Sequence, residues 1–332
     1  MPQTTPAADR LRAAAPGQRW TVRVRLPDGS ATDRLGWVED VGAEAITLAG
    51  PFDPAAGPGA VPPTWTVPYP TVLLARRVPA APGGPDPRRV PAEELERIAA
   101  PAWAAGTSPL GGWTLRSAGG FTGRANSCLA VGDPGRSTAE AAEVILAHAA
   151  RHGIAPLAQV VTGSAPDTDL RALGWRETYV ATDVLVVRLA DLLAGREADP
   201  AVAVADVLTP AWRAAFDQSR PSAADPAWVT AVLEGRPPRA FASRTEDDVV
   251  VSVARGHLGG AWLGLAAIWT SPTYRRRGLA TALMVALGHW AARRGARYGY
   301  LQVASANRDA QAAYARLGFT RHHRYHYLAP PD

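Results

Sequence analysis

Residues 271–283 read SPTYRRRGLATAL, which places three consecutive arginines directly before a glycine, Gly278. The apolar run at residues 261–270 is typical of a buried strand, and Pro272 marks its end. After the glycine, apolar residues recur with helical spacing as far as Gly295, a helix-ending signal. The stretch is therefore predicted to form a basic loop between a strand and the beginning of a helix.

A loop of this kind has the chemistry of an anion-binding site. The first N–H groups of a helix have no intrahelical acceptor and lie at the positive end of the helix dipole. A glycine allows the backbone to approach a ligand closely, and arginines add positive charge around it. Between Val249 and Arg308 the sequence has eight arginines and neither aspartate nor glutamate. This distribution favours an anionic ligand.

The composition sets broad limits on the function. The chain has 332 residues, all 35 basic residues are arginine, and the net charge is +5. That charge is modest for the length and does not favour general nucleic-acid binding. The single cysteine, Cys128, excludes an internal disulfide framework and indicates a reducing compartment. No stretch approaches the roughly 20 apolar residues of a membrane-spanning helix. We expect a soluble, cytoplasmic protein without a membrane partner, and the oligomeric state stays open.

The N-terminal part of the chain differs in character from the rest. Residues 1–15 are expected to form a disordered tail. Residues 16–80 contain short alternating segments separated by turn residues, which predicts a small β-barrel that resembles SH3-like barrels. Such barrels have many roles, and we expect a stabilising or docking module. Residues 81–89 are rich in proline and glycine and are predicted to be a stiff linker.

The remainder of the chain contains an internal repeat. HAARHG at residues 148–153 matches WAARRG at residues 290–295, an offset of 142, and Gly174 matches Gly318, an offset of 144. Both segments are predicted to form a helix, a strand, a second helix, a glycine turn and a strand, as expected of a duplication. The predicted fold class is therefore α/β in two tandem copies, at residues 90–195 and 196–332.

The second copy carries two motifs of a known family. Arg275-x-x-Gly278-x-Ala280 resembles the pyrophosphate-binding signature of the GNAT acetyltransferase superfamily. The segment NRDAQAAYARLGF, residues 307–319, resembles the second signature of that family, and the resemblance extends from Asp248 to the C-terminus. The two-copy plan behind a small β-barrel is similar to a group of actinobacterial GNAT proteins that are sometimes labelled as N-acetylglutamate synthases.

This resemblance implies an acetyl-CoA-dependent N-acetyltransferase. Backbone groups from Arg276 to Ala280 would hold the pyrophosphate of CoA, and the strand end would pair with the pantetheine arm. Tyr314 would protonate the departing thiolate, for which a phenol is a competent donor. The implied cofactor-binding residues are Ile268, Trp269, Thr270, Arg275, Arg276, Arg277, Gly278, Leu279, Ala280 and Asn307.

The first copy lacks the matching chemistry. An offset of 142 places the loop signature on Asp133-x-x-Arg136-x-Thr138, and an offset of 144 places Tyr314 on Leu170. The first copy is therefore predicted to be degenerate and to help form the acceptor pocket. Its segment at residues 111–127 is interpreted either as a plain hairpin or as a wall of that pocket. The side chains that could face the acceptor are Trp113, Arg116, Phe121, Arg124 and Asn126.

The sequence leaves the proton acceptor unassigned. The predicted central strands of the second copy have no carboxylate. The base could be Glu234, Asp248 or His257, or desolvation of the amine could suffice.

The residues RHHRYHY at 321–327 raise the possibility of a metal site through three histidines, but neighbours in a strand point to opposite faces. We therefore predict no metal.

Two functions follow from these observations. The first is acetylation of the primary amine of a small molecule or amino acid. The alternative is a non-catalytic acyl-CoA-binding or regulatory module in which the β-barrel docks a partner.

Overall fold

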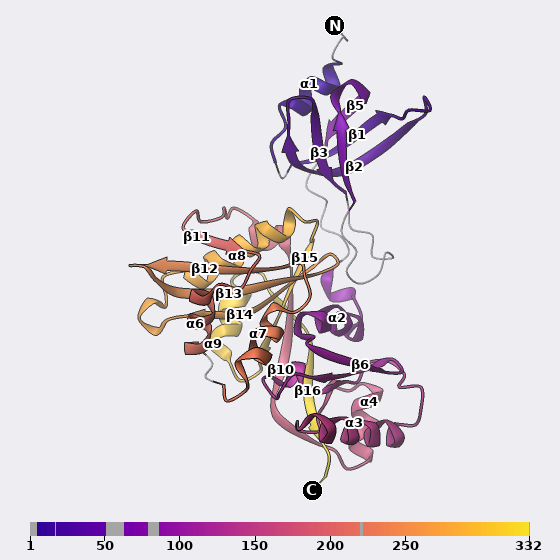
Figure 1. Cartoon of the computed structure of the whole chain (residues 1–332), viewed down its shortest axis with the longest axis vertical. Coiled ribbons are helices and arrows are strands. Elements are labelled where there is room, and N and C mark those ends of the chain that lie inside the picture. The colour runs from indigo at the N-terminus through magenta and orange to yellow at the C-terminus, as the bar shows by residue number, and fades with distance from the viewer. Residues whose placement is uncertain (1–4, 17, 51–62, 79–85, 220–221, 332) are drawn as a thin grey trace.

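The computed structural model describes the chain except residues 1–4, 17, 51–62, 79–85, 220–221 and 332 (Figure 1). The described strands form two sheets, one of five strands and one of eleven. Among these residues, no helix combines the length and the apolarity needed to cross a bilayer.

The N-terminal sheet is antiparallel and has the order β4-β3-β2-β1-β5. Its strands are β1 (Arg19–Arg25), β2 (Ala31–Val41), β3 (Ala45–Ala49), β4 (Thr64–Pro68) and β5 (Val72–Arg77). The predicted alternation is present, since Trp20, Val22 and Val24 are buried. However, β4 and β5 lie at opposite edges and do not pair in the described residues. The sheet is therefore not closed among the described residues, and the predicted SH3-like barrel is not confirmed.

The prediction of a disordered tail is wrong for residues 6–12, which form helix α1 (Pro6–Arg12). Thr5 caps its first turn by accepting a hydrogen bond from Ala8, and Pro6 occupies the first helical position. Ala7, Ala8 and Leu11 are buried within the apolar core of the N-terminal sheet. Burial of this short apolar face explains why the segment is ordered.

The predicted linker falls partly outside the described residues. Its last part, Pro87–Arg89, is a single 3₁₀ turn in which the Asp86 carboxylate accepts a hydrogen bond from the Arg88 backbone.

Two similar runs of elements follow. The first repeat contains α2 (Ala92–Ala99), η4 (Ala100–Trp103), β6 (Gly106–Leu110), β7 (Trp113–Ser117), β8 (Cys128–Leu129), α3 (Thr138–His152), β9 (Ala158–Val161), α4 (Ala165–Ala172) and β10 (Arg176–Arg188). After α5 (Leu189–Leu193), the second repeat contains β11 (Val202–Ala205), α6 (Pro210–Ser219), α7 (Pro226–Glu234), β12 (Arg239–Glu246), β13 (Val249–Gly259), β14 (Trp262–Thr270), η6 (Pro272–Tyr274), α8 (Leu279–Ala292), β15 (Tyr298–Ala304), α9 (Arg308–Ala315) and β16 (Thr320–Ala329). The predicted helix, strand, helix and strand are confirmed in both repeats.

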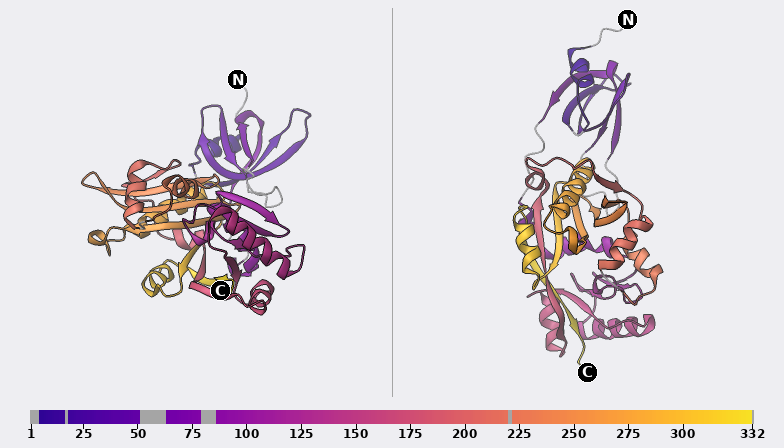
Figure 2. Two further views of the ribbon diagram at one scale, coloured as in Figure 1. Left: turned by 60° about the horizontal axis from the view of Figure 1, so that its bottom comes forward. Right: turned by 90° about the vertical axis from the view of Figure 1, so that its left-hand side faces the viewer.

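The two repeats share one sheet by exchanging their last strands. The strand order is β11-β12-β13-β14-β15-β10-β16-β9-β8-β7-β6. Strand β10 of the first repeat pairs with β15, and β16 of the second repeat pairs with β9. The exchanged strands pair with each other and lie side by side in the middle of the sheet (Figures 1 and 2). Each repeat therefore completes the sheet of the other.

The sheet of the second repeat is buried on both faces. On one face, α8 packs through Leu283 and Leu287 within the same core as Ala254. On the other face, α6 and α7 share a core with Phe241 and Val253. These strand residues alternate between the two faces as the period of a strand requires.

Candidate active site

The second repeat opens its sheet between two parallel strands. Strands β14 and β15 pair from Trp262 to Leu265 on the β14 side, and the pairing stops there although both strands continue. Ala267 has a positive φ of 51°, and the register with β13 shifts beside it. This bulge turns β14 away from β15. One backbone edge of residues 266–270 therefore faces an opening instead of a strand.

A cavity of about 360 Å³ lies at this opening. It is lined by Trp103, Arg124, Phe216, Ser219, Leu265, Ala266, Ala267, Ile268, Trp269, Leu301, Gln302, Val303, Ala304, Asn307 and Tyr314. Four of the predicted cofactor-binding and catalytic residues thus meet at one site: Ile268, Trp269, Asn307 and Tyr314. Two further side chains, Trp103 and Arg124, come from the first repeat.

The basic loop leads from the end of β14 into α8. Gly278 occupies the N-cap position with a φ of 80°, and no side chain caps the helix. A Cβ atom at this position would meet no protein atom within 4 Å, so the conformation, and not crowding by the protein, requires glycine. Arg276 also has a positive φ, of 60°. The first N–H groups of α8 are therefore directed at open space.

The arginine side chains of the loop are exposed and bind its own backbone. Arg275 Nε donates to the carbonyl of Thr270 at 3.2 Å, and Arg277 Nη2 donates to the carbonyl of Thr273 at 3.4 Å. The guanidinium of Arg277 also lies 5.0 Å from the ring centre of Tyr274. These contacts hold the loop to the end of β14 while leaving the positive charge at the surface.

Tyr314 and Asn307 reach the cavity from α9. The rings of Tyr314 and Phe319 pack edge to face, with their centres 6.1 Å apart. Burial raises the pKa of Tyr314, so the phenol keeps its proton around neutral pH. Asn307 caps α9, because its Oδ1 accepts a hydrogen bond from the Ala310 backbone at 3.2 Å. The tyrosine is a potential proton donor, and the asparagine positions its helix.

The corresponding loop of the first repeat is occupied by its own carboxylates. Asp133 Oδ1 accepts a hydrogen bond from the Gly135 backbone at 2.7 Å. Ser137 and Glu140 form a capping box at the start of α3, in which Glu140 Oε2 accepts from the Ser137 backbone at 3.0 Å. The turn between β6 and β7 also covers the loop, and Gly112 donates to the Asp133 carbonyl at 2.6 Å. This loop therefore offers little room or charge for an anion.

None of the three candidate bases lines the cavity. His257 is 2% exposed within β13. Burial lowers the pKa of His257 to about 3, because the charged imidazolium loses its hydration. Glu234 lies 3.9 Å from Arg239 in an ion pair, and Asp248 is exposed in the turn before β13.

The histidines of β16 are arranged differently from the strand pattern. The register with β10 shifts around His322, which inserts an extra residue and brings its Nδ1 to 2.7 Å from that of His323. A carboxylate also reaches them, because His323 Nε2 lies 2.9 Å from Glu96 Oε1. Neither feature was expected from the sequence. Across the described part of the chain, no three His, Cys, Asp or Glu residues are grouped to hold a metal ion.

Of the five side chains proposed to face the acceptor, only Arg124 lines the cavity. Trp113 and Arg116 are buried, and the guanidinium of Arg116 donates to the carbonyl and hydroxyl of Ser127. Asn126 is buried in its own turn, and Phe121 packs on Phe216. These four side chains therefore do not face the cavity, and the plain hairpin is not observed either, because the 3₁₀ turn Gly123–Ala125 stands where the second strand was predicted. Trp103 was missed, since no sequence pattern distinguishes a tryptophan in a short 3₁₀ turn.

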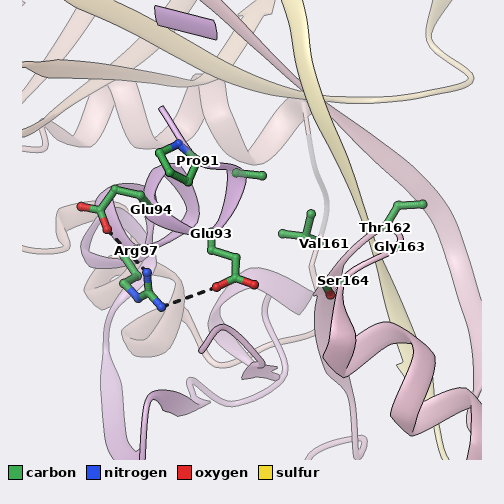
Figure 3. Close-up of a pocket in the computed structure, with 9 residues that line it drawn as sticks. Pro91, Glu93, Glu94, Arg97, Val161, Thr162, Gly163 and Ser164 are labelled. Carbon is green, nitrogen blue, oxygen red and sulfur yellow. Dashed lines mark hydrogen bonds and ion pairs between the residues drawn. The ribbon is translucent and has the colours of Figure 1, made fainter. Parts of the chain in front are cut away.

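A second cavity, of about 500 Å³, lies between α2 and the end of β9 (Figure 3). Arg97 points into it and lies 3.7 Å from Glu93 and 3.5 Å from Glu94. Arg97 is thus paired within its own helix, and the two carboxylates share this one guanidinium.

Comparison with known proteins places the fold in a family. The family described as "Probable histone acetyltransferase Rv0428c C-terminal" matches residues 92–328. The chain belongs to this family. Among solved structures, a GCN5-related N-acetyltransferase from Kribbella flavida is 18% identical, with a TM-score of 0.51 over 73% of this chain and 96% of that chain. The chain is thus a member of the GNAT superfamily.

More distant GNAT structures were also found. An acetyltransferase of the GNAT family from Novosphingobium aromaticivorans is 20% identical, with a TM-score of 0.45 over 67% of this chain and 90% of that chain. A tandem GNAT protein from the clavulanic acid biosynthesis pathway is 16% identical, with a TM-score of 0.45 over 62% of this chain and 76% of that chain. No curated protein matches the chain. Family and fold together assign this GNAT protein to the acetyltransferases.

Proposed function

We propose that this GNAT protein transfers an acetyl group from acetyl-CoA to the primary amine of a small molecule or amino acid. The observation that carries the proposal is the convergence of three features in the second repeat. The free edge of β14 and Tyr314 line one cavity, and β14 leads through the basic loop into the uncapped N-terminus of α8. Each feature matches a different part of acetyl-CoA.

The loop suits the pyrophosphate. The amides from Arg276 to Ala280 would bind it at the positive end of α8, and the exposed arginines would attract it. The edge of β14 at Ile268–Thr270 would pair with the amides of the pantetheine arm, as an added strand does. The thioester would then lie in the cavity lined by Tyr314.

The reaction is a direct transfer. The free amine attacks the thioester carbonyl carbon, a C–N bond forms, the C–S bond breaks, and the acetyl group leaves the sulfur. The attacking nitrogen loses a proton to water, and Tyr314 donates its proton to the thiolate of CoA. Water then returns a proton to Tyr314. Among the described residues, no carboxylate or imidazole lines the cavity, and on this proposal the amine enters as the free base.

The direct test measures thiol release from acetyl-CoA in the presence of a panel of primary amines and amino acids. Turnover that requires an amine, and that is strongly reduced in Tyr314→Phe, would support the proposal. Tight acetyl-CoA binding without turnover on any amine would contradict it.

A second function is favoured by the lack of a carboxylate or histidine in the part of the cavity lining that the structure describes. The chain could bind acyl-CoA without catalysis and act as a regulatory module, with its N-terminal sheet docking a partner. The same assay separates the two functions, because a module binds acetyl-CoA but releases no thiol with any amine.

A further inference from the structure

The charge of the candidate active-site cavity is unbalanced. Among the described residues that line it, Arg124 is the one arginine, and none is aspartate, glutamate or histidine. The guanidinium of Arg124, with no carboxylate beside it in this described lining, attracts a negatively charged group and repels a second cation. Because Arg124 belongs to the first repeat, the degenerate repeat supplies this charge to the site of the other.

The guanidinium of Arg124 is held in place on one side. Its Nε donates to the phenol oxygen of Tyr325 at 2.6 Å. Its central carbon lies 5.0 Å from the ring centre of Trp103 and 5.9 Å from that of Tyr325. Within the described part of the chain, its two Nη atoms have no acceptor. The group is thus oriented by two aromatic rings with its fork of donors unused.

A second uncompensated cation lies behind the same ring. Arg255 is 1% exposed, and its central carbon lies 5.7 Å from the ring centre of Trp103. Its Nη2 donates to the Ala102 carbonyl at 2.8 Å, whereas its Nε and Nη1 have no partner among the described residues. The buried Glu96 carboxylate does not offset these charges by contact, because it is bonded to Gln159 and His323.

We propose that the amine acceptor of this protein carries a carboxylate, and that Arg124 binds this carboxylate with its two free Nη groups. The inference rests on the proposed acetyl transfer and names the class of its acceptor. A guanidinium fork matches the two oxygens of a carboxylate. The volume of about 360 Å³ has to hold the acceptor beside the acetyl end of the co-substrate, which favours a small amino acid.

The experiment compares each acceptor with its own carboxamide. Amino acids whose carboxylate lies one, two or three carbons from the amine are paired with the matching amides, and kcat/KM is measured at saturating acetyl-CoA. The best acid should exceed its amide by at least about 10-fold, since charge-assisted hydrogen bonds are lost in the amide. An α-carboxamide lowers the pKa of the neighbouring amine, so more of the amide than of the acid is present as free base. This difference alone would favour the amide, and a preference for the acid therefore cannot come from it.

Variants at Arg124 test the residue. Arg124→Gln should lower kcat/KM for the preferred acid about 10- to 100-fold, chiefly through KM, and leave its amide unchanged. Arg124→Lys should retain part of the preference, because the charge remains and the fork is lost. Arg136→Gln, an exposed arginine of the same repeat, is the matched control and should behave as wild type. Unchanged acetyl-CoA affinity would show that the variants are folded.

The outcomes separate the two proposals. Turnover in which amides equal or exceed acids, or a preference that survives in Arg124→Gln, would overturn the carboxylate inference alone. Absence of thiol release with every amine, while acetyl-CoA still binds, would overturn the proposed acetyl transfer itself.

Discussion

The two repeats have the same run of helix, strand, helix and strand but begin their long helices in opposite ways. Helix α8 starts at Gly278 without a side-chain cap, whereas α3 starts at Ser137 with a complete capping box. A cap satisfies the free N–H groups of a helix and stabilises it, but it also uses the groups that would bind a phosphate. The first repeat therefore favours stability at the position where the second keeps a potential binding site.

The strands before these helices also differ in how many of their backbone groups are left without a partner. Strand β14 has nine residues and separates from β15 after Leu265, whereas β8 has two residues, Cys128 and Leu129, both paired with β9. At the corresponding positions, the first repeat thus has neither a long free strand edge nor an uncapped helix N-terminus. The fold that the repeats share is therefore not enough for an acetyl-CoA site, which also needs backbone groups without partners at the strand edge and at the helix N-terminus.

The largest effect is expected from Gly278→Val. A valine resists a φ of 80°, and its side chain would fill the space above the first turn of α8. Acetyl-CoA affinity, measured by calorimetry, should fall by about 100-fold. Gly135→Val is the matched control, since Gly135 has a φ of 71° in the corresponding loop of the first repeat. If both variants weaken acetyl-CoA binding equally, the functional contrast between the repeats is wrong.

A smaller loss is expected from Tyr314→Phe, which removes the proposed proton donor and keeps the ring. We expect kcat to fall about 10- to 100-fold with little change in the KM for acetyl-CoA. Because burial raises the pKa of Tyr314, the phenol stays protonated as the pH rises towards 10. The wild-type rate should therefore rise with pH as the acceptor amine loses its proton, without a descending limb below pH 10. A descending limb near neutral pH would point to another acid.

The difference between the repeats was visible in the sequence because it is local. The glycine, the arginines and the acidic replacement at Asp133 lie within a few residues of the helices that they affect. Thr5 and Pro6 were likewise sufficient to indicate α1, but the high proline and alanine content of the tail obscured them.

The exchange of β10 and β16 was not predictable in this way. Each strand alternates as it would in either repeat, and the choice of neighbour depends on packing across more than 100 residues. The contribution of Arg124 to the cavity follows from that exchange, because its partner Tyr325 lies on β16. The burial of His257 was not predictable either, because it depends on pairing with β12 on one side and β14 on the other.

Ser137→Ala, in the first repeat, is expected to change stability and not acetyl-CoA binding. This variant removes the cap of α3 and should lower the free energy of unfolding by about 1 kcal/mol in denaturant titrations. Acetyl-CoA affinity and kcat should not change, because the first repeat is not expected to bind the co-substrate. A variant that loses no stability but gains a second acetyl-CoA site would show that the cap blocks a functional loop.

The smallest loss of acetyl-CoA affinity is expected from Arg277→Gln. The neighbouring residue, Gly278, is the one expected to show the largest loss. The Arg277 side chain is exposed and its guanidinium binds the loop backbone, so its charge acts on a phosphate mainly through water. Acetyl-CoA affinity should fall about 2- to 3-fold at low salt, and the difference should disappear near 0.5 M salt, where charges are screened within about 4–5 Å. A loss as large as that of Gly278→Val, persisting in salt, would mean that arginine side chains hold the pyrophosphate. The contrast between the two repeats would then be one of charge and not of free backbone amides.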